Sequence, residues 1–252
     1  MSGGKGLKKI FTLLGAGLFV FWAFGSGPAE AQVKVQWFGH SCFQIVTPAG
    51  VKILADPFSP DMGYAMPSVS PDIVLVSHEH YDHNFVKMAK GSPKVLRGLN
   101  PETKDWNKID FTLKDVHIRS INAWHFEKEA DASRGKNAIM VMEMPGMRLV
   151  HLGDLGRPLN PEQIALLGKV DVLFLPVGGV YTIDAEAANK VLEQLKPSIV
   201  FPMHYKTPAL KLELNQLEPF LAGKTNVRKI SGNSFTISRL PEQQEIIVLD
   251  YK

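Results

Sequence analysis

The stretch that decides the fold is Ile73-Val74-Leu75-Val76, followed after one serine by His78-Glu79-His80-Tyr81-Asp82-His83. A short continuous run of apolar, mostly β-branched residues predicts a buried strand. The six residues after it hold three of the eight histidines of the chain, together with an aspartate. Neutral imidazole and carboxylate are ligands that Zn²⁺, Mn²⁺ and Fe²⁺ prefer. The pattern therefore predicts a metal site at the end of a strand.

The spacing of these side chains favours two ions over one. In an extended turn alternate residues point the same way, so His78 and His80 would face one ion. Asp82 and His83 would come from the start of a following helix, expected near Asn84, and face a second ion. The alternative is a solvated loop that is rich in histidine by chance, but three histidines in six positions argue against it.

Three more candidate ligands follow predicted strands. His125 comes after the alternating segment 116–124, Asp154 after residues 149–153, and His204 after residues 199–203. Taken singly, each is more often a capping or hydrogen-bonding residue than a ligand. The ends of several strands converge at one edge of a sheet, where binding sites commonly form, so we expect these side chains to lie together.

The predicted elements are mainly strands early in the chain, with strands and helices alternating later. Asn160-Pro161-Glu162-Gln163 predicts a helix start, with an N-cap and a box-closing glutamine, and Gly168 predicts its end. Further helices are expected at 184–195 and 213–221. Strands are expected at 33–37, 43–46, 51–55, 73–76, 116–121, 138–144, 148–152, 170–175, 199–201, 235–237 and 246–249.

Residues 1–31 are predicted to be a signal peptide. Lys5, Lys8 and Lys9 precede the uncharged apolar run 10–24, and Ala29-Glu30-Ala31 matches an A-x-A cleavage site. The run is shorter than the roughly 20 apolar residues that span a membrane, although an uncleaved anchor is the alternative. Cleavage would leave residues 32–252 as one periplasmic or secreted domain, because no change in composition divides that segment.

Composition and net charge limit the classes of binding partner that we expect. The chain is 45% hydrophobic and 21% charged, which excludes a disordered protein. Its formal net charge is +3, and loss of residues 1–31 would remove three lysines and one glutamate, leaving a nearly neutral domain. We therefore expect a small-molecule substrate, no nucleic acid, and no stable membrane partner after cleavage. A single cysteine excludes an internal disulfide.

The order His-x-His-x-Asp-His, a later histidine, a Gly-Asp pair and a final histidine resembles the metallo-β-lactamase superfamily over about residues 33–206. Four short segments resemble the branch that contains ascorbate-6-phosphate lactonase and related metal-dependent hydrolases. They are Trp-Phe-Gly-His-Ser at 37–41, Asp-Pro-Phe at 56–58, Leu-Pro-Val-Gly-Gly at 175–179 and Pro-Met-His-Tyr at 202–205. The resemblance implies an α/β fold, the four-layer αββα sandwich, with metals at one edge of two sheets.

Position by position, the resemblance also implies a ligand set for two divalent ions. The ligands are His78, His80 and His125 for the first ion, Asp82, His83 and His204 for the second, and Asp154 bridging both. Zinc is the expected metal, with manganese or iron as alternatives. The diiron flavoprotein branch has glutamate at the position of His80, so the histidine here argues against redox chemistry.

The expected mechanism follows from two adjacent cations. They would lower the pKa of a shared water, and the bridging hydroxide would attack an ester, lactone or phosphodiester. Asp82 and Asp154 are the candidate catalytic residues, since either could accept a hydrogen bond from the nucleophile. Two alternatives stay open. One is a phosphodiesterase of phospholipid-like or nucleotide substrates, because the resembled branch includes a phospholipase D-type enzyme. The other is a non-catalytic metal-binding member of the fold.

Three residues near the expected ligands are weaker candidates. His40, in Gly39-His40-Ser41, could orient a ligand or contact substrate, and a hydrogen-bonded turn histidine is an equal alternative. Tyr205 and Lys206 directly follow His204 and could contact an anionic substrate.

Overall fold

The computed structural model describes residues 1–4, 32–126 and 134–252. The predicted signal peptide falls on residues 5–31 and so lies outside the described residues, apart from the first four. Within the described ranges, no helix combines the length and the apolar character that crossing a bilayer would need.

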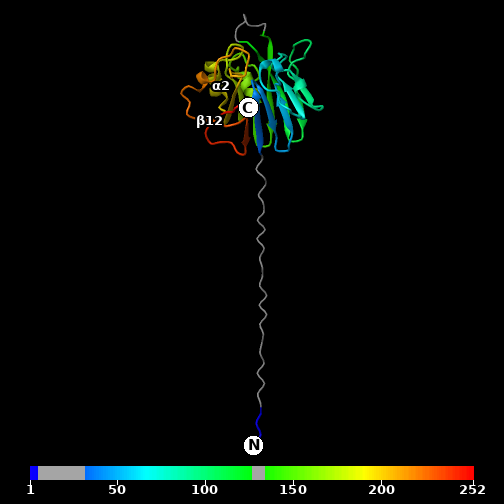
Figure 1. Ribbon diagram of the computed structural model, residues 1–252, viewed down its shortest axis with the longest axis vertical. Coiled ribbons are helices and arrows are strands. Elements are labelled where there is room, and N and C mark those ends of the chain that lie inside the picture. The colour runs from blue at the N-terminus through cyan, green and yellow to red at the C-terminus, as the bar shows by residue number, and fades with distance from the viewer. Residues whose placement is uncertain (5–31, 127–133) are drawn as a thin grey trace.

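The strands of the described residues form two mixed sheets that pack face to face (Figure 1). The first sheet has the order β13-β1-β2-β3-β4-β5 and the second the order β12-β14-β11-β10-β9-β8-β7-β6. The first contains β1 (Val33–Gly39), β2 (Cys42–Val46), β3 (Lys52–Ala55), β4 (Ile73–Val76), β5 (Lys94–Arg97) and β13 (Ser234–Ile237). The second contains β6 (Asp110–Leu113), β7 (Val116–Trp124), β8 (Lys136–Met144), β9 (Met147–His151), β10 (Val172–Pro176), β11 (Ile199–Met203), β12 (Val227–Lys229) and β14 (Glu245–Val248).

Strand directions determine which chain segments meet at each edge. In the first sheet β1 and β3 are both antiparallel to β2, and β4 is parallel to β3, so β1, β3 and β4 run the same way. In the second sheet β7 and β9 are both antiparallel to β8, and β10 and β11 continue parallel to β9. The carboxyl ends of these strands therefore lie together along one edge of each sheet.

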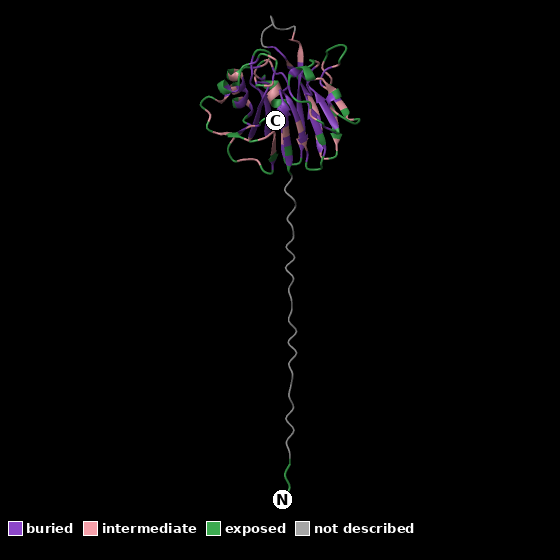
Figure 2. Ribbon diagram, viewed as in Figure 1, coloured by how far each residue is buried: buried purple, intermediate pink, exposed green. Residues whose placement is uncertain are grey.

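The core lies between the two sheets, where buried strand residues face each other (Figure 2). At its centre the Phe174 ring lies 4.6 Å from the Phe43 ring of the first sheet and 5.4 Å from the Phe201 ring. All three side chains are buried. Burying an aromatic side chain stabilises a fold by about 1.5–3 kcal/mol. The contact between Phe174 and Phe43 therefore stabilises the packing of the two sheets.

Two helices of the second half form as their sequences predict. Helix α1 (Pro161–Leu167) has the complete capping box between Asn160 and Gln163, and the chain leaves the helix at Gly168. Helix α2 (Ala185–Leu195) is capped by Asp184 and buries the apolar side chains along one face. Helix α3 (Glu218–Leu221) is only the end of the helix expected at 213–221, because the backbone of Asn215 bonds to Gly178 and Lys206 instead.

The prediction of a helix that begins near Asn84 is wrong. The chain forms only a 3₁₀ turn, η2 (Val86–Met88), because tertiary backbone bonds replace helical ones. Phe85 N–H donates to the Pro57 carbonyl and Lys90 N–H donates to the Val69 carbonyl, 2.8 Å each. A second 3₁₀ turn, η1 (Pro60–Met62), lies in the same region.

The αββα class is confirmed, although 3₁₀ turns and loops cover the outer face of the first sheet in the described residues. A second apolar cluster packs there, with outward-facing strand residues such as Leu54 and Val74 meeting loop residues such as Phe58 and Met62. Three short strands went unpredicted, namely β5, β6 and β12. They lie at or next to sheet edges and are partly exposed, so their sequences lack a sustained apolar pattern.

Candidate metal centre

The candidate site is built from side chains that follow the carboxyl ends of strands. The contributing pairs are β1 with His40, β3 with Asp56, β4 with His78, β7 with His125, β9 with Asp154 and β11 with His204. Because these strands run the same way within each sheet, residues far apart in sequence meet at one edge. The sequence prediction that strand ends converge is confirmed for His125, Asp154 and His204 by the contacts below.

The first group consists of His78, His80 and His125. One nitrogen from each side chain lies within 4.8 Å of the others. The His78 Nε2 and His80 Nδ1 atoms are 3.0 Å apart, and the His125 ring centroid is 4.8 Å from that of His78. The alternate residues of the motif thus face the same point, as their spacing predicts.

The second group contains Asp82, His83 and His204, and the structure adds His40 to it. One ligand atom from each of the four lies within 4.8 Å of the others. The His40 Nε2 atom lies 3.1 Å from Asp82 Oδ2, and its ring centroid lies 4.2 Å from that of His204. His40, expected only near the site, is therefore inside the second group.

Asp154 contacts both groups. Its Oδ2 atom lies 3.1 Å from His125 Nε2 and 3.8 Å from His78 Nε2 in the first group. The same atom is 3.3 Å from His204 Nε2, and Oδ1 is 3.1 Å from His83 Nε2 in the second. Asp154 is thus the side chain that links the first group to the second.

The buried atoms of this cluster fit a metal ion. His83 Nε2, His204 Nε2 and Asp154 Oδ1 are buried and lack a hydrogen-bond partner. Buried polar atoms in folded proteins are nearly always hydrogen-bonded, and an uncompensated one is costly. Imidazole nitrogens and carboxylate oxygens that converge in a buried site are the donor atoms that a divalent cation requires, so the cluster could bind metal.

The electrostatics of the cluster favour, for most of the candidate ligands, the protonation state that can bind a metal ion. Burial lowers the pKa of His40 to about 4 and the pKa of His78 well below its usual value, so both imidazoles are neutral at pH 7. Burial would raise the pKa of Asp154, but His204 and His83 hold it well below the usual range. Burial would also lower the pKa of His83, yet Asp154 and Asp82 raise it well above its usual value. A cation bound at His83 would take the place of this proton.

Asp56 orients one ligand of each group, and sequence reasoning did not assign it a role. Its carboxylate accepts hydrogen bonds from Ser77 N (2.7 Å), Ser77 Oγ (2.6 Å) and His83 Nδ1 (2.9 Å). Because the Ser77 hydroxyl proton goes to Asp56, His78 Nδ1 donates to Ser77 Oγ at 2.9 Å. With Nδ1 engaged in this way, both imidazoles direct Nε2 toward the cluster. In the sequence, Asp56 follows a predicted strand and begins the Asp-Pro-Phe segment at 56–58, one of the four segments that carry the resemblance.

Asn137 holds Asp154 in place. Its Nδ2 donates to the Leu152 carbonyl at 2.8 Å, and its Oδ1 accepts from Asp154 N at 3.1 Å. The intervening Gly153 has φ +54°, and a Cβ there would lie 2.3 Å from Asn137 Oδ1. Glycine is therefore required for the chain to pass this close to Asn137.

The other residues singled out from the sequence lie away from the cluster opening. Tyr205 is buried with its ring 5.5 Å from that of Trp37. Lys206 Nζ donates to the Leu212 carbonyl and to Glu213 Oε1, at 2.7 and 2.9 Å. Neither residue lines the cavity at the cluster.

That cavity has a volume of about 290 Å³ and opens onto side chains of the His/Asp cluster. Its lining residues are His80, Tyr81, Asp82, His125, Arg134, Asp154, Tyr181 and Leu212. Both Asp82 and Asp154, the candidate catalytic carboxylates, face this space, so a small molecule could reach them.

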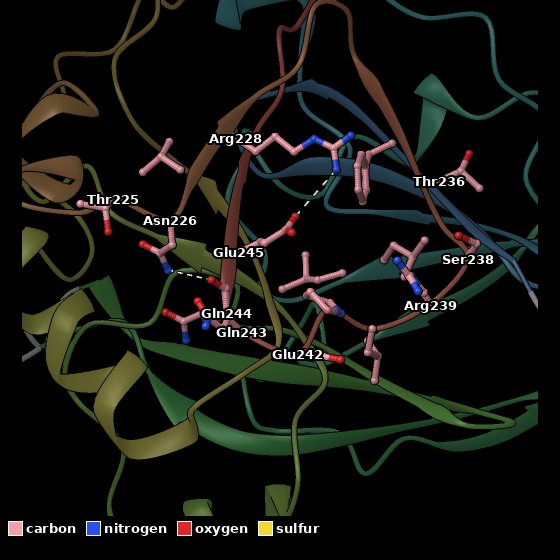
Figure 3. A pocket seen from close by; sticks show the side chains of 16 residues that line it. Thr225, Asn226, Arg228, Thr236, Ser238, Arg239, Glu242, Gln243, Gln244 and Glu245 are labelled. Carbon is pink, nitrogen blue, oxygen red and sulfur yellow. Dashed lines mark hydrogen bonds and ion pairs between the residues drawn. The ribbon is translucent and has the colours of Figure 1, made fainter.

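A larger cavity, of about 860 Å³, lies elsewhere (Figure 3). It is lined by Ile199 at the start of β11, whereas His204 follows the end of that strand. Figure 3 shows Arg228 and Glu245 pointing toward each other in it, with Arg228 Nη1 3.8 Å from Glu245 Oε2. Its lining contains no histidine or cysteine, so we place the chemistry at the smaller cavity.

Two mixed sheets with a His/Asp cluster at their shared edge define a metallohydrolase of the metallo-β-lactamase type. Comparison with known proteins agrees, because a β-lactamase superfamily domain matches residues 34–204, more than half of the chain. The chain belongs to the β-lactamase superfamily.

Relatives within this superfamily are named metal-dependent hydrolases. A UPF0173 metal-dependent hydrolase of Thermococcus onnurineus is 30% identical and aligns with 77% of this chain and 95% of its own length. Another, of Archaeoglobus fulgidus, is 31% identical over 69% of this chain and 84% of its own. The predicted superfamily and the prediction of a metal-dependent hydrolase are thereby confirmed.

Solved structures support the same fold. A candidate Zn-dependent hydrolase of the metallo-β-lactamase superfamily from Thermotoga maritima superposes with a TM-score of 0.70 at 34% identity. It covers 86% of this chain and 98% of its own. A metallo hydrolase from Ignicoccus hospitalis, at 23% identity and TM-score 0.59, shares the fold over 82% of this chain and 98% of its own.

Proposed function

We propose that this hydrolase is exported and uses two divalent cations, zinc by preference, to cleave an ester, lactone or phosphodiester of a small molecule. The observation that carries the proposal is the position of Asp154. Its two carboxylate oxygens contact imidazoles of both groups at 3.1–3.8 Å. A single carboxylate shared by two sets of ligands fits a pair of ions better than one.

The roles proposed for the side chains follow from their contacts. His78, His80 and His125 would hold one cation, and Asp82, His83 and His204 the other. Cations at these positions would supply a lowered water pKa and a Lewis acid for a carbonyl or phosphoryl oxygen.

Asp82 is the better of the two candidate carboxylates for handling a proton. Asp82 Oδ2 is already engaged by His40 Nε2 at 3.1 Å, which fixes the plane of the carboxylate. Its other oxygen can accept a hydrogen bond from an attacking water and steer it toward the substrate. Asp154 contacts four imidazoles and is better placed to hold the ligands.

A hydrolysis screen tests the proposal. Purified protein loaded with Zn²⁺ or Mn²⁺ should hydrolyse at least one substrate among aryl esters, lactones and phosphodiesters. A chelator should abolish the activity and added metal should restore it. Asp82→Asn should lower kcat by about 10²–10⁴-fold, as loss of a proton acceptor does, while still binding metal. Full activity of metal-free protein would overturn the proposal.

The phosphodiesterase alternative is separated by the same screen. Turnover of bis(p-nitrophenyl) phosphate without turnover of p-nitrophenyl acetate or of a lactone would favour it. Metal binding without turnover of any of them would favour a non-catalytic member of the fold.

Export is a separate part of the proposal and rests on Lys5, Lys8 and Lys9, the apolar run 10–24 and the Ala29-Glu30-Ala31 site. N-terminal sequencing of protein recovered outside the cytoplasm tests it. The expected first residue is Gln32, and an intact N-terminus on membrane-bound protein would instead support an uncleaved anchor.

A further inference from the structure

We propose that the cavity over the metal cluster contains an aromatic subsite, formed by Tyr181 and Tyr81, that binds a planar apolar group of the substrate beside the bond to be cleaved. The proposal rests on the proposed function, in that it takes this cavity to be the catalytic one. It adds the chemical class of the substrate, an aryl ester or aryl-substituted lactone, which neither the family nor the ligand set specifies.

The first observation is where exposed apolar side chains gather. Among the described residues, large hydrophobic side chains that stay exposed are few; two of them line this cavity, and a third, Val180, directly precedes Tyr181 in the chain. They are Tyr81 at 52%, Val180 at 49% and Tyr181 at 38% exposure. Single exposed apolar side chains are ordinary, but a group at the mouth of a functional cavity marks a binding surface.

The second observation is the placement of the two tyrosines around the cavity. Tyr81 lies between His80 and Asp82 in the chain, and Tyr181 comes from the turn between β10 and α2. Both line the cavity, together with Leu212. A group bound against the cluster would therefore contact an aromatic side chain from each of two segments.

The third observation is that the Tyr181 ring is held in place. The Arg134 guanidinium lies over it, 5.5 Å from the ring centroid, and Arg134 also lines the cavity. Such a cation–π contact stabilises one orientation of the ring. The contact thus holds an aromatic surface in place at the wall of the cavity.

The fourth observation is backbone strain beside Tyr181. Val180 has φ +58°, a left-handed conformation that is unfavourable for a β-branched residue. Its side chain is 49% exposed, so little burial of valine offsets this strain. The turn is held on both sides, since Tyr181 N donates to the Gly179 carbonyl at 2.6 Å and Ile183 N donates to the Leu155 carbonyl at 2.9 Å.

Strain of this kind is retained where a function requires the conformation. Because Val180 directly precedes Tyr181, we infer that its left-handed backbone directs the Tyr181 side chain toward the cavity. The four observations agree in placing the Tyr181 ring, held in one orientation, at the wall of the cavity.

The test compares two probes that differ only in an aryl group. Binding of benzylphosphonate and of methylphosphonate to the zinc-loaded protein is measured by isothermal titration calorimetry. We expect benzylphosphonate to bind about tenfold more tightly, as stacking with aromatic side chains would give. Tyr181→Ala and Tyr81→Ala should each remove much of this preference, and Tyr181→Phe should keep it.

Leu166→Ala is the matched control, because Leu166 is an exposed apolar residue at 52% exposure on α1 and does not line the cavity. It should bind both probes as the wild type does. Equal affinity of the wild type for both probes, or a preference that survives in Tyr181→Ala and Tyr81→Ala, would overturn the subsite.

Failure of the aromatic subsite can be distinguished from failure of the proposed function. If the probes are discriminated but no ester, lactone or phosphodiester is hydrolysed, the subsite stands and the proposed reaction is wrong. If hydrolysis occurs with equal kcat/KM for phenylacetate and acetate esters of one alcohol, the reaction stands and the subsite is wrong.

Discussion

Replacing Asp56 by asparagine should weaken metal binding although Asp56 is not itself an expected ligand. The carboxylate accepts hydrogen bonds from Ser77 N, Ser77 Oγ and His83 Nδ1 at 2.6–2.9 Å. In Asp56→Asn the amide oxygen can keep the bond from Ser77 N. The amide nitrogen cannot accept from the serine hydroxyl or from His83, so the orientation of His83 Nε2 toward the cluster is no longer enforced.

The size of the effect follows from the bonds that are lost. A hydrogen bond to a charged group is worth about 1.5–3 kcal/mol. Loss of the one that sets the His83 tautomer then predicts metal affinity reduced by about 10- to 100-fold, since each 1.4 kcal/mol is tenfold. This agrees with the usual cost of removing a group that orients a metal ligand.

The assay is competition for Zn²⁺ between the protein and a chromophoric chelator, for the wild type and Asp56→Asn. The control is Asp171→Asn, which also alters a buried carboxylate that accepts from a backbone N–H, that of Arg148 at 2.8 Å. Asp171 precedes β10 and so lies at the opposite end of that strand from the cluster. Both variants should lose thermal stability, but only Asp56→Asn should lose affinity. Wild-type affinity in Asp56→Asn would refute the role given to Asp56.

Two further perturbations have signs that the structure determines. Asp110 at 2.8 Å and Glu143 at 3.2 Å raise the pKa of His117. The contribution of protonated His117 to the stability of the fold is therefore fully present below about pH 6.5 and is lost as the pH rises through the folded-state pKa. His117→Gln should therefore lower the free energy of unfolding in urea at pH 5.5 more than at pH 9, and an equal loss at both values would contradict this. Val180→Gly should raise the free energy of unfolding by no more than about 1 kcal/mol. Relief of the left-handed strain at Val180 outweighs the larger conformational entropy that a glycine loses on folding. A loss of several kcal/mol would show that Val180 makes contacts that its exposure hides.

The part of the site that could be predicted from the sequence consists of residues that lie close together along the chain. His78, His80, Asp82 and His83 lie within six residues after one buried strand, and the pattern alone indicates ligands. The more distant ligands could be inferred because they follow strands, and parallel strands bring their carboxyl ends to one edge. Their identity as ligands remains a prediction that metal analysis must test.

The parts that could not be predicted depend on contacts between remote segments. The role of Asp56 exists only because Ser77 and His83 reach its carboxylate from another part of the chain. His40 joins the second group because its ring lies beside His204. Neither relation leaves a periodic signal in the sequence.

The same limitation explains the errors in secondary structure. The segment after Asn84 has helix-forming residues, but its backbone groups bond to the preceding loop at Pro57 and Val69, and this tertiary pairing overrides local propensity. Tyr181 went unnoticed for a different reason, since its placement depends on the positive φ of Val180, which no pattern of residue types announces.

We propose above that one chain holds two divalent cations, one in each of two distinguishable groups of side chains. Metal content per chain, measured by inductively coupled plasma mass spectrometry after Zn²⁺ loading and removal of free ions, tests it directly. We expect two ions in the wild type, one ion in His80→Ala or His204→Ala, and two ions in the control Leu166→Ala. A wild type that retains a single ion, or that keeps two ions in both histidine variants, would contradict it.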